Sequence, residues 1–257
     1  MTDLEKAQKL AAVADEITKK YYLSARLRVD TKPDKTPVTQ ADLEVEQALS
    51  NIVHEEFGDK YIGEEEVRDT SEGRHWIVDP IDGTKNFLRG MPIWATLIAL
   101  RDGDTPLVNF VSAPALGRAW WAVKGEGAWT LDVDGTVRQL RVSNISDISD
   151  ASFMFSSLGS WDQVPTGSQS VLQLLLAAWR HRAVGDFFGH VLVAEGAVEA
   201  CLEPNLKLWD VAGVELIITE AGGSLWTNGQ GKAPSEPRIV ISSNQKIEAA
   251  VRQALRL

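Results

Sequence analysis

The sequence predicts a mixed α/β fold. Short apolar runs that suit buried strands alternate along the chain with amphipathic helical segments. The composition is that of an ordinary globular protein, with 44% hydrophobic and 24% charged residues. A length of 257 residues is enough for one or two domains with a large core. These observations exclude disorder, collagen and coiled coil as the structure of the whole chain.

In the first half, two helices precede a group of strands. Apolar residues at helical spacing predict a helix over 4–22, and Thr39 is expected to begin a second helix that Gly58 ends. Two prolines and three charged residues predict an ordered turn or a mobile loop over 31–38. Strands are expected at 76–78, 92–100, 107–112 and 119–123, with hairpin turns at 124–127 and 134–135.

In the second half, helices and strands interleave without an internal repeat. The expected helices are 167–182, 189–195, 211–221 and 246–257. The expected strands are 152–156, 199–202, 223–226 and 239–242.

Charge and cysteine content exclude several functions. The chain has 36 acidic and 26 basic residues, a net charge of −10, whereas nucleic acids and anionic membranes attract Lys and Arg. The single cysteine, Cys201, excludes an intrachain disulfide and a cysteine-based zinc site. The N-terminal residues contain no apolar signal core, and no apolar run has the length of a membrane span. We therefore expect a cytoplasmic protein without nucleic-acid or membrane partners.

The segment from Trp76 to Asn86 contains the strongest chemical signal. Asp79 and Asp82 lie three residues apart at the end of an expected strand, and Gly83 and Thr84 follow where a helix could begin. Such a helix start offers backbone N–H groups to a phosphate, and the two carboxylates suit a magnesium ion that bridges to it. A tight turn that caps a helix would give the same spacing.

Three further acids stand in separate parts of the chain: Glu64, Asp210 and Asp42. Taken alone, each is typical of a solvated acid or a helix N-cap. If they converge, two such charges about 4 Å apart repel by roughly 4 kcal/mol at an effective dielectric of 20. Divalent cations would relieve that repulsion.

Together these motifs resemble the inositol monophosphatase family. The resemblance rests on Gly63-Glu64-Glu65, on the segment 76–84 and on Trp209-Asp210-Val-Ala-Gly213, and it extends to 38–42 and 219–223. It implies a layered αβαβα sandwich with two sub-domains and the metal site at their junction. Residues 1–135 would contain most metal ligands, and residues 136–257 would contain Asp210 and the substrate loop.

The resemblance also implies two to three Mg²⁺ ions in each subunit. Glu64, Asp79 and the backbone carbonyl of Ile81 would hold the first ion. Asp79, Asp82 and Asp210 would hold the second, and Glu64 would assist a third.

The implied reaction is hydrolysis of a phosphate monoester by in-line attack of a metal-activated water. Catalysis would involve Glu64 together with Asp42 and Thr84, which would orient or deprotonate the water. Asp82, Gly83 and Thr84 would bind the phosphate. Because members of the family are commonly homodimers, we expect a homodimer.

The substrate is expected to be histidinol phosphate, because Gly185-Asp186-Phe-Phe-Gly189 and the segment 86–96 resemble the histidinol-phosphatase branch of the family. Inositol-type enzymes have a small residue where this chain has Asp186. Asp186 and Glu203 would meet the ammonium and imidazole groups of the substrate, and Trp94 or Phe187 would pack on the ring. Arg182 would contact the substrate or a subunit edge.

Several alternatives stay open at this stage. Asp186 could be a structural N-cap or the ion-pair partner of Arg182. The substrate could be inositol 1-phosphate, or the enzyme could be a broad small-molecule phosphatase. A catalytically silent metal-binding module is the alternative from outside the enzymes.

Overall fold

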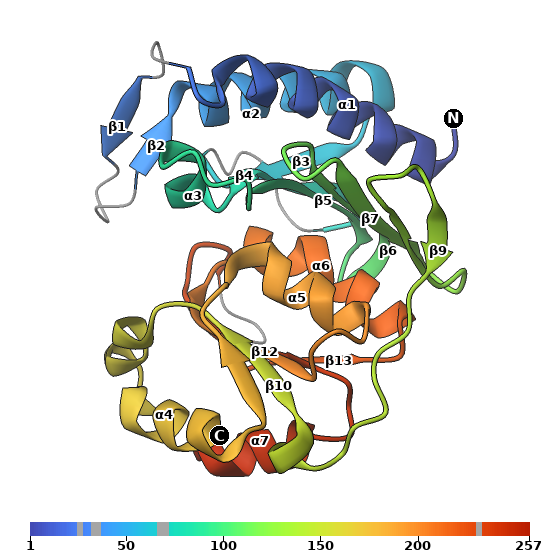
Figure 1. The fold of residues 1–257 in the computed structure, drawn as a ribbon. Helices are drawn as coiled ribbons and strands as arrows, with labels where there is room; N and C mark the ends of the chain where they lie inside the picture. Colours follow the sequence, from blue (N-terminus) through green and yellow to red (C-terminus); the bar gives the residue numbers. More distant parts are fainter. Residues whose placement is uncertain (25–27, 32–36, 66–71, 230–232) are drawn as a thin grey trace.

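The computed structural model describes residues 1–24, 28–31, 37–65, 72–229 and 233–257. In this part of the chain, helices and sheets stack in five layers, in the order helix, sheet, helix, sheet, helix (Figure 1). The predicted αβαβα sandwich is therefore confirmed. No helix within the described ranges has both the length and the apolar character needed to cross a bilayer.

The first helix layer consists of α1 (Asp3–Tyr21) and α2 (Gln40–Ile52), and α2 continues into a π-helical turn, η1 (Val53–Phe57). Gly58 follows with φ of 68°, a left-handed conformation that ends the helix as predicted. Beside α2, the short strands β1 (Val29–Thr31) and β2 (Pro37–Thr39) pair antiparallel. The predicted loop over 31–38 lies mostly at 32–36, outside the described residues.

The second layer is a seven-stranded sheet in the order β3-β4-β5-β6-β7-β8-β9. Its strands are β3 (Lys60–Gly63), β4 (Arg74–Asp82), β5 (Ala95–Asp102), β6 (Thr105–Ala113), β7 (Arg118–Val123), β8 (Ala128–Leu131) and β9 (Val137–Gln139). Only the β3–β4 pair is parallel. A short helix, α3 (Thr84–Leu88), follows β4 directly.

The middle layer consists of α5 (Asp186–Ala194) and α6 (Leu208–Glu220), which lie between the two sheets (Figure 1). Most residues of α6 are buried around its whole circumference, because sheets lie on both sides. Asn109 of β6 reaches into this layer: its side chain accepts from the N–H of Leu216 (2.7 Å) and donates to the carbonyl of Ala212 (2.6 Å). These bonds fix α6 in position over the first sheet.

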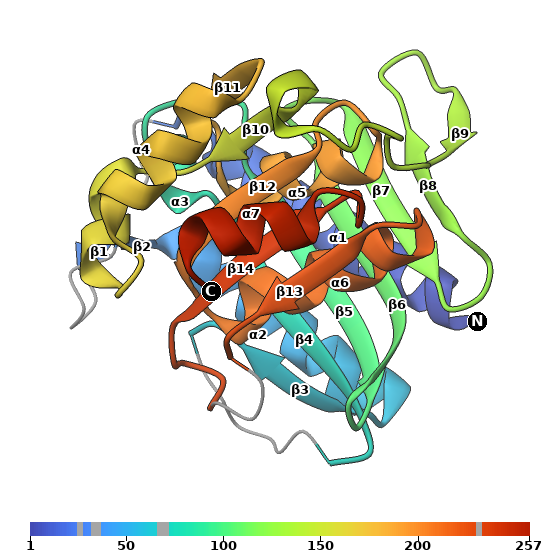
Figure 2. The same cartoon turned by 90° about the horizontal axis from the view of Figure 1, so that it is seen from below.

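The remaining layers are a five-stranded sheet, in the order β11-β10-β12-β14-β13, and outer helices. The strands are β10 (Ser152–Phe155), β11 (Arg180–Arg182), β12 (Ala200–Leu206), β13 (Ser224–Thr227) and β14 (Arg238–Ser243). The helical elements are α4 (Gly167–Ala177), α7 (Glu248–Leu255) and the 3-10 turns η2 (Ile148–Asp150) and η3 (Leu158–Gln163). Figure 2 shows α7 in front of this sheet.

Some predicted boundaries are wrong. The helix expected over 167–182 ends at Ala177, and residues 180–182 form β11, which pairs with β10. Tertiary pairing overrides the local helical pattern there. The helix expected over 189–195 begins earlier, at Asp186. The sub-domain boundary at 135/136 stays a prediction, and β9, just beyond it, still pairs with β8 of the first sheet.

Gly213 permits the close approach of α6 to the first sheet. A Cβ atom at this position would lie 2.5 Å from Cβ of Leu97 on β5. Because a real Cβ atom cannot approach that closely, any side chain here would push α6, and Asp210 with it, away from the sheet.

We predict that Gly213→Ala lowers the free energy of unfolding by about 1–3 kcal/mol, the usual cost of overpacking a core. Urea denaturation measures the change. The matched control is Gly159→Ala, because a Cβ there would meet only the Ser157 hydroxyl at 4.0 Å. The control should stay within about 0.5 kcal/mol of the parent protein. Equal effects of the two substitutions would contradict this packing argument.

Candidate metal centre

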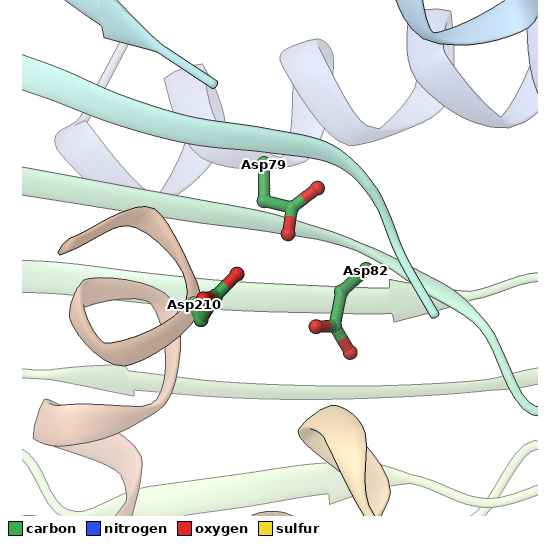
Figure 3. A group of neighbouring side chains, drawn as sticks. All are labelled: Asp79, Asp82 and Asp210. Carbon is green, nitrogen blue, oxygen red and sulfur yellow. The ribbon is translucent and has the colours of Figure 1, made fainter. Parts of the chain in front are cut away.

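Three aspartates converge where the first sheet meets the middle helix layer (Figure 3). Asp79 and Asp82 come from the end of β4, and Asp210 comes from the first turn of α6. One carboxylate oxygen of each lies within 4.8 Å of the other two. Asp79 is only 2% exposed and Asp82 only 7%. The sequence prediction that these three residues share a site agrees with this geometry.

A bulge in β4 turns Asp79 and Asp82 toward the same side. In a regular strand, residues three apart point to opposite faces of the sheet. Here Asp79 pairs with Leu97 while Asp82 pairs with Ala95, so β4 contains one extra residue between them. The Asp79 carboxylate accepts from the N–H of Ile81 (3.0 Å), which holds the bulge. The Asp-Pro-Ile-Asp segment is thus a strand bulge as well as a turn into a helix.

Gly83 and Thr84 connect the bulge to α3. Gly83 has φ of 80°, a conformation that glycine adopts without strain, and it is the N-cap of α3. The Thr84 hydroxyl donates to the backbone carbonyl of Ile81 at 3.0 Å. The structure therefore brings these predicted phosphate-binding and water-orienting residues beside the aspartates.

Asp42 lies buried in the first turn of α2. Its Oδ2 atom accepts from both the N–H (2.8 Å) and the hydroxyl (2.6 Å) of Thr39, the N-cap residue. Burial, together with the charges of Glu64 and Glu65, raises the pKa of Asp42 to about 7. The capping contacts hold one carboxylate oxygen and leave Oδ1 as the atom available for other chemistry.

Glu64 directly follows β3 and lies outside the group of three aspartates. Its charge nevertheless acts on them. After burial, Glu64 is the largest cause that raises the pKa of Asp79 and of Asp210. The role of Glu64 as a metal ligand stays a prediction, and its charge affects the aspartates of the cluster.

The cluster is suited to a hard cation. Burial and the charges of neighbouring acids raise the pKa of Asp79 and Asp82 well above the ordinary aspartate range, and burial together with the charge of Glu64 raises the pKa of Asp210 to about 7. Such carboxylates are costly to ionise without a compensating positive charge. An all-oxygen donor set of this kind fits Mg²⁺ or Ca²⁺ rather than a soft metal.

Asp186 stands beside the cluster, at the start of α5. The next residue, Phe187, donates its backbone N–H to Asp82 at 2.7 Å. The Asp186 carboxylate accepts from the Asn86 amide (3.0 Å), and its backbone N–H donates to Glu203 (3.1 Å). Its φ of 57° is rare for a residue with a side chain, and such strain is typical of functional positions.

Glu203 lies almost fully buried behind Asp186. Burial, together with the charge of Asp186, raises the pKa of Glu203 to about 8. No sequence pattern indicates a role for Asn86, although its side-chain amide donates to the Asp186 carboxylate. The 100 residues between the two explain why local sequence patterns could not reveal this contact.

Trp94 does not have the predicted role. Its side chain is 0% exposed and packs in the core, 4.9 Å from the ring of Phe87 and 5.2 Å from that of Tyr22. A substrate ring therefore cannot stack on it. Arg182 lies exposed on β11, and its guanidinium donates to the carbonyl of His181. A substrate contact by Arg182 stays a prediction.

Comparisons with known proteins identify the family that this chain resembles. A model of the inositol monophosphatase family matches residues 1–256. The chain is 47% identical to a histidinol-phosphatase of Mycobacterium tuberculosis, over 94% of this chain and 93% of that protein. It is 45% identical to a histidinol-phosphatase of Streptomyces coelicolor, over 96% and 94% of the two chains. Its fold is similar to that of an IMPase of Thermotoga maritima, with a TM-score of 0.85, 25% identity and coverage of 100% and 97%.

We predict that the metal-free protein loses stability as the pH rises from about 4 to about 8. The pKa of Asp42 and of Asp210 is raised to about 7, and that of Glu203 to about 8. Between their unfolded and folded pKa values, the folded state binds more protons than the unfolded state, so the free energy of unfolding falls as the pH rises.

Thermal melts in a chelator between pH 5 and pH 8 measure this effect. Added Mg²⁺ should raise the melting temperature more at pH 8 than at pH 5, because it competes with protons for the same oxygens. Asp210→Asn should flatten the pH dependence. A melting temperature that rises with pH in the chelator would contradict the prediction.

Proposed function

The chain belongs to the inositol monophosphatase family, and from this premise we propose that it hydrolyses L-histidinol phosphate to L-histidinol and phosphate. Enzymes of this family are metal-dependent phosphomonoesterases, and the ion is typically Mg²⁺. Two relatives that match this chain at 45–47% identity over nearly its whole length are histidinol-phosphatases. A role in histidine biosynthesis, and with it a cytoplasmic location, is part of the same proposal.

The single observation that supports this substrate best is the placement of Asp186. Phe187, the residue after it, bonds Asp82 of the metal centre, and Asn86 and Glu203 hold Asp186 itself. A phosphate ester bound at the aspartates would therefore have its leaving group near two carboxyl groups. An ammonium or imidazolium group would pair with these acids, whereas an anionic group would be repelled.

Asp79, Asp82 and Asp210 would hold Mg²⁺ together with Glu64 and the carbonyl of Ile81, with two to three ions in each subunit. When bound, the ions would lower the pKa of a water and neutralise charge on the phosphoryl oxygens and the leaving group.

The protein's own groups would position and deprotonate the attacking water. Thr39 engages Oδ2 of Asp42, and we assign Oδ1 as the acceptor of the water proton. The Thr84 hydroxyl, held by the Ile81 carbonyl, would orient the same water, and Gly83 and Thr84 would bind the phosphate.

We also propose a homodimer. Three apolar side chains of α4 and of the segment between α4 and β11 are exposed, Trp179 by 68%. β11 is the edge strand of the second sheet. The other two are Leu172 and Leu176. Apolar side chains next to an unpaired strand edge are typical of a subunit interface.

The first experiment measures phosphate release with Mg²⁺ for histidinol phosphate and for myo-inositol 1-phosphate. We expect kcat/KM to favour histidinol phosphate by a hundredfold or more, roughly 2.7 kcal/mol of transition-state discrimination. A preference for the inositol ester would leave the metal chemistry intact and overturn the proposed substrate. Mg²⁺ binding without turnover of either ester would favour a catalytically silent module.

A second prediction concerns Asp186→Asn, which removes the charge while tolerating the left-handed backbone. Losing a charged partner for the substrate cation should raise KM for histidinol phosphate by about tenfold or more. KM for inositol 1-phosphate, which has no cation, should change less than about twofold. Equal changes for the two substrates would mean that Asp186 has only a structural role.

A third prediction concerns Asp82→Asn. The amide keeps an oxygen that can accept from Phe187 N–H, so folding should persist, but the loss of a charged metal ligand should lower kcat/KM at least about 100-fold. Circular dichroism checks the fold and phosphate release checks the rate. A near-normal rate in the folded variant would overturn the metal assignment.

A further inference from the structure

Glu46 is a buried acid that the chemistry described so far does not use. It lies on α2, four residues after Asp42, so both side chains project from the same face of the helix. Only 5% of Glu46 is exposed. Burying a carboxylate without a partner is costly, so its contacts should show what it does.

Two of its contacts are with the chain on either side of Glu64. The Glu46 Oε2 atom accepts from the backbone N–H of Glu65 at 2.9 Å. The same carboxylate lies against Gly63, where an added Cβ atom would overlap it. Glycine at position 63 therefore makes room for the carboxylate of Glu46.

These contacts of Glu46 lie at and just beyond the point where the pairing of β3 ends. The pairing of β3 with β4 ends at Gly63 and Val78, so the strand ladder does not extend to Glu64. Glu46 contacts the residue before Glu64 and bonds the residue after it. Through these two contacts, α2 sets the path of the backbone that carries Glu64, whose charge acts on Asp79 and Asp210.

We propose that Glu46 is a positioning residue that holds the Gly63–Glu65 backbone so that Glu64 reaches the metal centre. The inference rests on the proposed role of Glu64 as a magnesium ligand. Partners that orient a metal ligand typically change metal affinity 10–100-fold when they are lost. The hydrogen bond to Glu65, rather than the charge of Glu46, is the operative interaction.

The test measures the affinity of the metal-free protein for Mg²⁺ alone, by titration calorimetry. Glu46→Ala should weaken binding about tenfold or more. Glu46→Gln should stay within about threefold of the parent protein, because its amide oxygen can accept the same N–H. The matched control is Glu44→Ala: it removes one acid from α2, but that acid bonds Tyr21 and Lys20, so Mg²⁺ affinity should not change. Unchanged affinity in Glu46→Ala, or equal losses in Glu46→Ala and Glu46→Gln, would overturn the proposal.

Gly63→Ala provides a second, independent test. In the parent background it should weaken Mg²⁺ binding, because the new methyl group displaces the Glu46 carboxylate. In the Glu46→Ala background it should add little, because the overlapping group is gone. Such non-additivity is expected only for residues in contact, and additive losses would contradict the proposal. If Glu46→Ala fails to fold in chelator melts, Glu46→Asp replaces it in both tests, because its shorter side chain withdraws the carboxylate from Glu65.

Glu64→Gln separates the two levels of the argument. If this variant binds Mg²⁺ normally, the proposed ligand role of Glu64 is wrong. If it binds weakly while Glu46→Ala binds normally, the ligand role stands and only the positioning role of Glu46 is wrong.

Discussion

The crowding of acidic groups around Asp79, Asp82 and Asp210 is the constraint on which the rest of the structure depends; Asp79 and Asp82 are buried and Asp210 is half-buried. Each of these carboxylates accepts a backbone N–H from a different place: Asp79 from Ile81, Asp82 from Phe187, and Asp210 from Lys207. These bonds favour the ionised forms, but burial outweighs them and the pKa values rise. A bound cation would favour the ionised form of all three carboxylates.

The five-layer architecture brings these donors together. The bulge of β4 belongs to the first sheet, whereas the starts of α5 and α6 belong to the middle layer. Gly213 lets α6 approach β5 closely, and Asn109 ties α6 to β6. The same middle layer presents Asp186, so one packing arrangement sets both the metal centre and the proposed leaving-group pocket.

A third region, α2, acts on the site from the outer side of the sheet. Asp42 lies in its first turn, where the N-cap residue Thr39 bonds it, and Glu46 lies one turn later. Because residues four apart on a helix face the same way, one rigid element positions both Asp42, the proposed base, and the backbone around Glu64. Rigid elements hold catalytic groups more accurately than loops do.

Local patterns predicted much of the fold. Amphipathic spacing indicated the helices within a few residues, and apolar runs indicated most strands. The boundaries that failed, such as the strand at 180–182, depend on pairing with a distant strand. The burial of Trp94 could not be predicted from local sequence either, because an aromatic residue beside a motif can be buried in the core or exposed to a substrate.

By itself, the sequence determined the α/β class and the absence of an intrachain disulfide and indicated the acids of the proposed metal site, because these depend on composition and on motifs a few residues long. Only the tertiary structure decided which face Asp79 and Asp82 share, that Asn86 holds Asp186, and that Glu46 holds the backbone around Glu64. The strand bulge and the contacts between residues 19 and 100 positions apart arise from tertiary packing. The short-range periodicity of the sequence therefore cannot predict them.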